Sequence, residues 1–441
     1  MKIKYRIMSI KFKMNLIGLA FLTVLNCSSG GDDSTSGEDT EAPSNPKNLV
    51  ATNLTETTVD LTWDASTDNV NVLTYLVYQN DNNLASNTST SYSVNSLSPN
   101  TTYTFKVQAK DNAGNTSSFS NVVSVTTLDV DAELKYESGS IEAYLGTFIN
   151  SVPGSSGNDY FEPTDIELDT WDLVVKAVLN NNITEAVEMS ALLDYQIKEF
   201  TDNTLSPNQT FYIIEKQPSK FNHWGTYVFS KTPSKENLVI TAPHVISDAN
   251  TGKQAAYCFR ENIAKAVFLS GTHRCNNSNF TACSGTTTVC NSSSEAYRIS
   301  DMAHNVQSIF QRTSEVVSDD LPNTVFIQLH GFTKLSTDPY VIMSNGARQT
   351  PTVDYATLIK NELLVEDNTL TFKIAHIDTD WSRLIGFTNT QSRYMNNSSN
   401  PCSTSATNTT GRFIHIEQER TKLRNDVTGW KKMSEALKRV F

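Results

Sequence analysis

The stretch Thr324-Val325-Phe326-Ile327-Gln328-Leu329-His330-Gly331 is a nearly continuous apolar run that ends in a histidine and a glycine. Such a run is typical of a strand covered on both faces, because a strand with one face in solvent alternates apolar and polar residues. The stretch therefore predicts a central sheet between two other layers.

Similar apolar runs lie on both sides of this stretch, at residues 238–242, 266–269, 372–375 and 413–417. Helical spacing occurs at residues 171–193, 253–265, 301–317 and 354–365, and strand-like segments occur at residues 195–200, 211–215 and 226–229. Strands that alternate with helices predict an α/β domain with three layers, αβα, around a mixed sheet. We assign this domain to residues 131–441.

Polar side chains follow the buried strands, at the ends where ligands bind in open α/β sheets. In chain order they are His244, then His273 with Arg274, then His330, then His376, and finally His415, Glu417 and Glu419. The last three share one face of their strand, because side chains alternate with a period of two. Five strand ends that carry such groups indicate a functional site rather than core packing.

His244, Asp248 and His330 form the predicted metal site. His244 and Asp248 are four residues apart on one short loop, and His330 ends another strand. Two histidines and a carboxylate are a common ligand set of hydrolytic zinc, which lowers the pKa of water to about 7. Glu417 lies outside the ligand set and is the predicted general base. Glu261 is an alternative ligand, but it lies far along a predicted helix.

Four segments of this domain resemble, in order, those of N-formylglutamate amidohydrolases, whose fold is similar to that of zinc carboxypeptidases. They are residues 242–244, 272–274, 328–332 and 415–420, the last followed by Leu423-Arg424. The resemblance spans residues 238–424 and implies a zinc-dependent hydrolase of amide or peptide bonds. Asp248 stands where the family usually has Glu, and Gln328 where it usually has Asp.

Further residues are candidates for binding the substrate. Arg274 and Arg424 can clamp a substrate carboxylate through two hydrogen bonds. His273 belongs to the segment shared with the family, and Asn389 and Arg393 lie in a polar loop that we expect to line the pocket.

Three other polar residues have a structural interpretation. Asp301 is the expected N-cap of the helix at residues 301–317, which puts His304 in its first turn, from where it can reach the cleft. His376 is either a support for the site or a structural histidine at a strand end, and the sequence does not separate the two.

Residues 43–128 read as short strands separated by turn residues, the pattern of a β-sandwich. The segment resembles a fibronectin type III domain over its whole length, through Trp63, the corner at residues 97–103 and the turn at residues 111–115. We expect Trp63 and Tyr103 to lie in the core. The segment contains no histidine or cysteine, so its expected role is that of a spacer or a weak adhesion module.

The N-terminus, residues 1–26, has the basic stretch and the short apolar run of a secretory signal peptide. It ends at Val24-Leu25-Asn26-Cys27, which resembles the lipobox of exported lipoproteins, and this resemblance implies a lipid on Cys27. Residues 27–42 are a flexible acidic linker by composition. The chain is therefore predicted to be lipid-anchored at the outer membrane or cell surface.

Five further cysteines remain. Cys275, Cys283, Cys290 and Cys402 lie in polar loops, and an exported chain permits disulfides, so these four are the expected paired set. Four cysteines allow three pairings, and the sequence does not choose among them. Cys258 lies in a helical pattern and is expected to be a buried thiol.

The formal net charge is −12, and no basic block follows the signal. Nucleic-acid binding is therefore not expected, because it needs a basic face to neutralise phosphates. The leading hypothesis is a membrane-tethered zinc hydrolase of a peptide-like or amide substrate, which touches the membrane through its anchor only. The alternative is a surface-binding or adhesion lipoprotein that keeps the hydrolase fold without activity. A serine hydrolase is disfavoured because the chain has no Gly-x-Ser-x-Gly motif.

Overall fold

The computed structural model of the chain describes residues 39–128 and 132–441. The predicted signal peptide, Cys27 and most of the predicted linker lie outside these residues. Residues 39–42 were assigned to the linker but contact the first domain: Asn69 Nδ2 donates to Asp39 Oδ1, and Asn115 Nδ2 donates to the Asp39 carbonyl. The first domain therefore includes Asp39, four residues earlier than Pro43.

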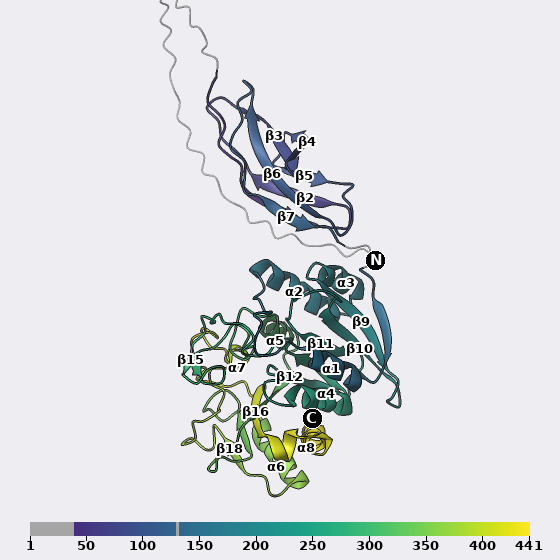
Figure 1. Cartoon of the computed structure of the whole chain (residues 1–441), viewed down its shortest axis with the longest axis vertical. Coiled ribbons are helices and arrows are strands. Elements are labelled where there is room, and N and C mark those ends of the chain that lie inside the picture. The colour runs from purple at the N-terminus through teal and green to yellow at the C-terminus, as the bar shows by residue number, and fades with distance from the viewer. Residues whose placement is uncertain (1–38, 129–131) are drawn as a thin grey trace, which may run out of the picture.

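The first domain is a β-sandwich of two antiparallel sheets, with strand orders β1-β2-β5 and β4-β3-β6-β7 (Figure 1). The strands are β1 Lys47–Thr52, β2 Val59–Asp64, β3 Val72–Gln79, β4 Asn82–Asn87, β5 Ser91–Val94, β6 Thr102–Asp111 and β7 Val123–Thr126. Trp63 and Tyr103 are buried as expected. The Tyr103 hydroxyl accepts a hydrogen bond from the Ser98 amide at 2.9 Å, which fixes the corner at residues 97–103.

The second domain is built on a ten-stranded mixed sheet in the order β18-β17-β19-β16-β12-β13-β11-β10-β9-β8. The strands are β8 Lys135–Gly139, β9 Tyr195–Asp202, β10 Gln209–Lys216, β11 Thr226–Ser230, β12 Lys235–Ala242, β13 Ala264–Leu269, β16 Val325–Phe332, β17 Val341–Ser344, β18 Phe372–Ile374 and β19 Phe413–Glu419. Strands β13, β12, β16 and β19 are parallel neighbours. Their carboxyl ends therefore meet at one edge, as the sequence predicts.

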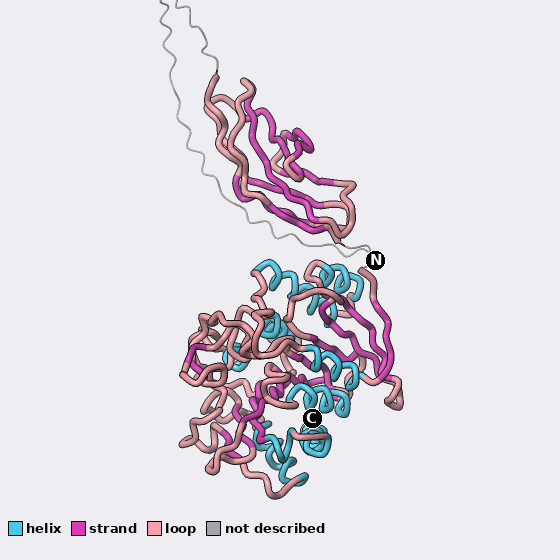
Figure 2. Tube along the Cα trace, viewed as in Figure 1, coloured by secondary structure: helices cyan, strands magenta, loops and turns pink. Residues whose placement is uncertain are grey.

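Helices cover both faces of this sheet (Figures 1 and 2). One face packs against α1 Ile141–Ser151, α4 Thr251–Asn262, α6 Tyr355–Glu366 and α8 Val427–Val440, and the other against α2 Asp165–Leu179, α3 Ile183–Ala191, α5 Ile309–Asp320 and α7 Thr390–Met395. Successive residues of a strand pack on opposite faces of the sheet. Ile240 packs on the face covered by α1, α4, α6 and α8, and Val239 packs on the face covered by α2, α3, α5 and α7. This explains the continuous apolar runs, since both faces of each central strand are buried.

Several predicted elements differ from the structure. The helix expected at residues 171–193 is two helices, α2 and α3. The helix expected at residues 301–317 begins only at Ile309, where the Ser308 side chain caps it by accepting a hydrogen bond from the Gln311 amide. Asp301 is therefore not an N-cap. The polar loop expected at residues 389–393 is the start of α7, with Asn389 as its N-cap.

The strand predicted at residues 372–375 is β18, and it lies at the edge of the sheet rather than beside the central strands. β17, a short strand that the sequence analysis missed, separates it from β19. His376 consequently lies away from the other strand ends, with its Nε2 atom 2.9 Å from Asp354 Oδ2. Its environment in the structure is that of a structural histidine.

Two disulfides tie together the loops of the second domain, Cys275–Cys290 and Cys283–Cys402. These are the four cysteines expected to pair, so that prediction is confirmed. Cys258 is a buried free thiol, as expected, and burial raises its pKa well above the usual range. Cys290 of the first disulfide lies in the turn between β14 Thr286–Thr287 and β15 Glu295–Ala296, and the second disulfide joins the segment before β14 to the segment that follows α7.

Removing the long-range disulfide should destabilise the second domain more than removing the short one. The Cys283–Cys402 pair spans 119 residues and the Cys275–Cys290 pair spans 15. Loop-closure entropy predicts losses in the free energy of unfolding of about 4–5 and about 3 kcal/mol for the two double-serine variants. Denaturant unfolding of both variants beside the native chain measures the difference, and the reverse order would contradict the expectation.

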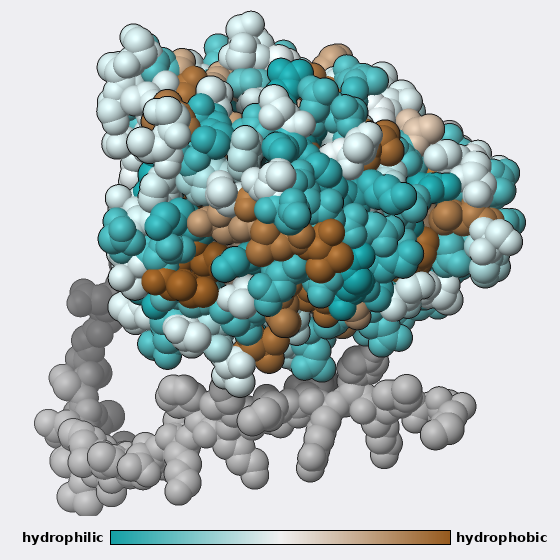
Figure 3. Space-filling view, turned by 90° about the horizontal axis from the view of Figure 1, so that it is seen from below, coloured by the Kyte–Doolittle hydropathy of each residue, from teal (hydrophilic) through white to brown (hydrophobic). Residues whose placement is uncertain are grey.

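None of the helices in residues 39–128 or 132–441 is long and apolar enough to cross a membrane. On the face drawn in Figure 3, hydrophobic residues lie in small groups separated by hydrophilic ones. That face gives no indication of a large apolar docking surface.

Candidate metal centre

The polar groups at the ends of β12, β16 and β19 converge on one cavity of about 420 Å³. His244 follows β12, His330 lies near the end of β16, and Glu417 lies on β19 directly beside His330 in the parallel register. The cavity is also lined by residues of the β14–β15 region and by residues 382 and 384–388. Parallel strand order thus brings together side chains that are more than 170 residues apart.

Three ligand atoms form a nearly equilateral triangle beside this cavity, which His244 and His330 line. His244 Nδ1 lies 3.1 Å from Asp248 Oδ2, His330 Nδ1 lies 3.3 Å from the same oxygen, and the two Nδ1 atoms are 3.2 Å apart. Tetrahedral zinc with nitrogen and oxygen ligands at about 2.0–2.1 Å has neighbouring ligand atoms about 3.3 Å apart. The three predicted ligands therefore match one face of such a tetrahedron.

The far nitrogen of each histidine ring is held by a hydrogen-bond acceptor. His244 Nε2 lies 2.9 Å from Asp301 Oδ1, and His330 Nε2 lies 2.8 Å from Gln328 Oε1. Gln328 is itself oriented, because Asn389 donates to its oxygen and its own amide donates to Gln391. With both Nε2 atoms donating, both Nδ1 atoms present lone pairs to each other and to Asp248.

This convergence of lone pairs is unfavourable unless a cation or a proton lies between them. Two donors reach the corners of the triangle: Gly331 N donates to Asp248 Oδ2 at 3.1 Å, and Arg274 Nη1 lies 3.4 Å from His244 Nδ1. Buried polar atoms that face one another in this way are typical of a site made for an ion. The residues present therefore fit zinc.

The pKa values of the site agree with this electrostatic picture. Burial and the Arg274 charge lower the pKa of His244, but Asp248 and Asp301 outweigh them and raise it above its ordinary value. Burial lowers the pKa of His330 to about 3, so this ring is neutral, as a ligand must be. Burial opposes ionisation of Asp248, but the two histidines hold its pKa well below the usual range. Without a metal ion, a proton on His244 relieves the repulsion between the lone pairs.

His415 and Glu417 line the same cavity and lie beside each other, with His415 Nε2 3.4 Å from Glu417 Oε1. Both ring nitrogens of His415 and Oε2 of Glu417 are buried and have no hydrogen bond to any described residue. The His415 ring packs against that of His330, with centroids 4.4 Å apart. A buried carboxylate oxygen that lacks a donor is free to exchange a proton with a bound molecule. Glu417 thus lies where the sequence analysis expected its general base.

Of the predicted substrate-binding residues, the structure brings only Arg274 into this cavity. Its Nε and Nη2 atoms both donate to Asp301 Oδ2, at 3.0 and 2.6 Å, which leaves Nη1 without a carboxylate partner. The predicted two-point clamp on a substrate carboxylate is therefore not available through that edge of the guanidinium group.

Arg424, predicted to clamp a substrate carboxylate, lies behind the site. Its side chain donates to the carbonyls of Gln418, Asp248 and Ala249. A Cβ atom on Gly331 would lie only 2.1 Å from Arg424 Cζ, so the glycine is required for this packing. Arg424 holds the loop that presents Asp248 and does not line the cavity.

The other predicted substrate contacts also lie elsewhere. His273 lines a neighbouring polar cavity of about 610 Å³ and accepts a hydrogen bond from the Cys275 amide. Asn389 donates to Gln328 and caps α7. Arg393 donates to the carbonyls of Phe387, Pro401 and Cys402 and braces the disulfide-linked loop. The sequence placed these residues near the site. Asn389 and Arg393 support segments beside it, whereas His273 lies outside its cavity.

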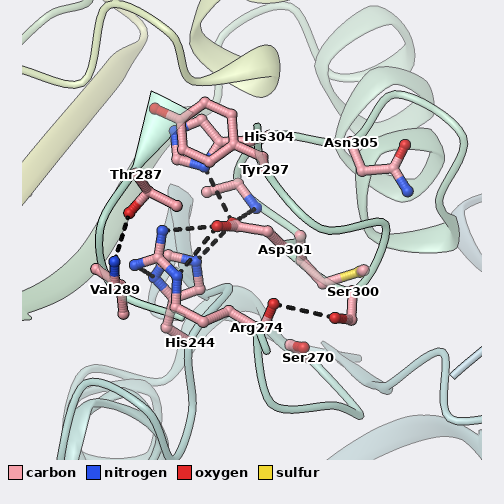
Figure 4. A network of polar contacts seen from close by, with 12 residues as sticks. His244, Ser270, Arg274, Thr287, Val289, Tyr297, Ser300, Asp301, His304 and Asn305 are labelled. Carbon is pink, nitrogen blue, oxygen red and sulfur yellow. Dashed lines mark hydrogen bonds and ion pairs between the residues drawn. The ribbon is translucent and has the colours of Figure 1, made fainter. Parts of the chain in front are cut away.

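Asp301 is the main residue that the sequence analysis misassigned. Figure 4 shows its carboxylate between Arg274 and His304, with the Tyr297 ring lying on that of His304. Burial opposes its ionisation, but Arg274 and the two histidines hold its pKa well below the usual range. Asp301, His244 and His304 also have ligand atoms close enough for a metal. Since Arg274 already neutralises this carboxylate, we interpret the group as a hydrogen-bonded support for His244.

The comparisons with known proteins concern the first domain. The fibronectin type III family model matches residues 44–126. Chitinase Chi52 of Paenibacillus xylanexedens is 48% identical over 99 residues, 22% of this chain and 18% of that protein. Chitinase A1 of Niallia circulans is 47% identical over 91 residues, 21% of this chain and 13% of that protein.

Among solved structures, chitinase ChiA74 from Bacillus thuringiensis matches with 43% identity and a TM-score of 0.20, over 21% of this chain and 14% of that chain. The chain thus spans less than a fifth of the length of these chitinases. Both curated matches fall in the fibronectin-like region. Residues 44–126 of this chain therefore form a fibronectin type III domain.

Proposed function

We propose that the second domain is a zinc-dependent hydrolase of amide or peptide bonds. The observation that carries the proposal is the triangle of His244 Nδ1, His330 Nδ1 and Asp248 Oδ2, whose edges measure 3.1–3.3 Å. Three ligands on one side leave room for a substrate on the other, as in catalytic rather than structural zinc sites. The resemblance of residues 238–424 to N-formylglutamate amidohydrolases supports an amide as the substrate.

Each group around the triangle has a role in this proposal. When bound, zinc would act as a Lewis acid that polarises a carbonyl group and acidifies water. Asp301 and Gln328 hold the two histidine rings in the tautomers that expose Nδ1. At Oε2, Glu417 takes up a proton from the water whose oxygen bonds to the substrate carbonyl carbon, and it delivers that proton to the leaving nitrogen as the C–N bond breaks. Arg274 Nη1 can donate to the substrate carbonyl oxygen.

Chelation and restoration of zinc test this function. The full chain is assayed on a panel of acylated amino acids and peptides before chelation, after it and after zinc is added back. We expect amide hydrolysis that is lost on chelation and restored by zinc. Hydrolysis that is insensitive to chelation would contradict the proposal, and bound zinc without turnover would favour the inactive surface-binding module instead.

The Gln328→Leu variant should weaken zinc binding without removing a ligand. It deletes the acceptor of the hydrogen bond from His330 Nε2, which fixes the tautomer of that ring. Loss of such an orienting partner lowers metal affinity by about 10–100-fold. Competition with a chromophoric chelator measures the change. The Gln349→Leu variant, a glutamine that lines no part of the cavity, is the control, and equal zinc affinity in both variants would contradict this role.

We further propose that the protein is exported and anchored at the cell surface by a lipid on Cys27. The basic and apolar segments before Cys27 and the acidic tail after it support this location. The two disulfides of the second domain also favour an oxidising compartment. A Cys27→Ala variant should lose the lipid mass and leave the membrane fraction, and unchanged membrane association would contradict the anchor.

A further inference from the structure

We propose that His304 sets substrate specificity by accepting a hydrogen bond from a substrate N–H through its Nε2 atom. The inference rests on the proposed function, because it assigns the kind of substrate that the same cavity takes. His304 lines this cavity together with His244, His330 and Glu417. From the sequence, His304 was placed at a helix start within reach of the cleft, without an assigned contact.

The hydrogen bonds around Asp301 fix which nitrogen of His304 carries the proton. His304 Nδ1 lies 3.0 Å from Asp301 Oδ1, an oxygen that also accepts from His244 Nε2. An ionised carboxylate has no proton to give, so both rings must donate to it. Within the described part of the chain His304 Nε2 has no hydrogen-bond partner, and the side chain keeps 12% exposure. The acceptor lone pair of Nε2 is therefore available in the cavity.

The ring of His304 is held in place by stacking. Its centroid lies 3.6 Å from that of Tyr297, with an angle of 7° between the planes. The Tyr297 hydroxyl lies 3.0 Å from Thr388 Oγ1, so the stack is attached to the segment at residues 384–388 that forms another wall of the cavity. A ring fixed on one face and along one edge presents its acceptor in one direction, which is what selective recognition needs.

The charges around the cavity favour an uncharged, N–H-bearing group over a carboxylate at this position. Burial lowers the pKa of His304 to about 4, so the ring is neutral at neutral pH. Arg274, the arginine of the cavity wall, already makes two hydrogen bonds to Asp301. A neutral acceptor repels a carboxylate but pairs well with a backbone N–H. We therefore assign this position in the cavity to a backbone N–H of a peptide rather than to a free C-terminal carboxylate.

A depsipeptide scan tests this assignment. The ligands are acetyl-trialanine amide, the parent peptide, and analogues in which each internal N–H is replaced in turn by an ester oxygen. Calorimetry measures their binding to the full-length, zinc-loaded Glu417→Gln protein. The measurement is made with His304 intact, with His304→Ala and with His304→Gln. One analogue should bind about 3–10-fold more weakly than the parent when His304 is intact. The His304→Ala substitution should weaken binding of the parent peptide by a similar factor and should leave the affinity for that analogue unchanged. His304→Gln, which keeps an acceptor oxygen, should restore the preference.

The matched control is His273→Ala, which removes a histidine from outside the cavity and should leave the preference unchanged. The assignment is overturned if every analogue binds as tightly as the parent peptide, or if the difference persists in His304→Ala. It is also overturned if the parent peptide does not bind, or if trialanine as the free acid binds more than tenfold more tightly than its amide. The same titrations on metal-free protein separate the two proposals. If the preference for the N–H does not depend on His304 in a protein that binds zinc and hydrolyses amides, only this assignment is contradicted. If the preference depends on His304 in a protein that neither binds zinc nor hydrolyses amides, only the proposed function is contradicted.

Discussion

The Glu417→Gln variant is expected to keep its zinc and to lose turnover by about 10²–10⁴-fold. The substitution preserves the shape of the side chain and its place beside His330 on β19. It removes the ability to take up a proton at Oε2, the buried oxygen that has no hydrogen-bond donor. Steady-state rates on the best amide of the panel, together with zinc content per chain, measure both halves of the expectation.

Glu419→Gln is the matched control for this experiment. Glu419 lies two residues further along the same strand, and its carboxylate accepts from Thr421 and Lys422 instead of facing the cavity. This variant should keep zinc and full turnover. Unchanged activity in Glu417→Gln, or the same loss in both variants, would contradict the role assigned to Glu417.

The His330→Ala variant should lower zinc affinity by more than about 100-fold, because even the partners that only orient a ligand contribute 10–100-fold. The ring supplies one corner of the triangle and has a buried acceptor, Gln328, behind it. Zinc titration of chelator-treated protein measures the loss. Circular dichroism and thermal unfolding show whether the sheet has survived the substitution.

His376→Ala provides the comparison. His376 is also a buried histidine at a strand end, but it is hydrogen-bonded to Asp354 and lies outside the triangle. Zinc affinity should be unchanged in this variant. A similar loss in both would mean that damage to the fold, and not removal of a ligand, explains the effect.

The central part of the fold could be predicted from sequence because its strands are buried on both faces. Continuous apolar runs predicted β12, β13, β16 and β19. The placement of the polar side chains at the ends of these strands followed from the alternation of side chains along a strand. The four-residue strand β17, Val341–Ser344, was missed. That omission misplaced His376, because β17 inserts between β18 and β19.

The site could be predicted in part, for a related reason. His244, Asp248, His330 and Glu417 each stand at a strand end or in the loop that follows, so the order of the parallel strands brings them together. Asp301 precedes a helical pattern and reads as an N-cap. Its contacts with His244 and Arg274 join residues 57 and 27 positions apart, which no local pattern reveals. Arg424 resembled a substrate clamp by motif, but backbone carbonyls take up its donors.

Anomalous scattering at the zinc edge, recorded on crystals of the protein without added metal, locates the bound ion. We expect one peak per chain, about 2.0–2.1 Å from His244 Nδ1, His330 Nδ1 and Asp248 Oδ2. A peak bound instead by Asp301 and His304, or no stoichiometric metal at this triangle, would contradict this expectation.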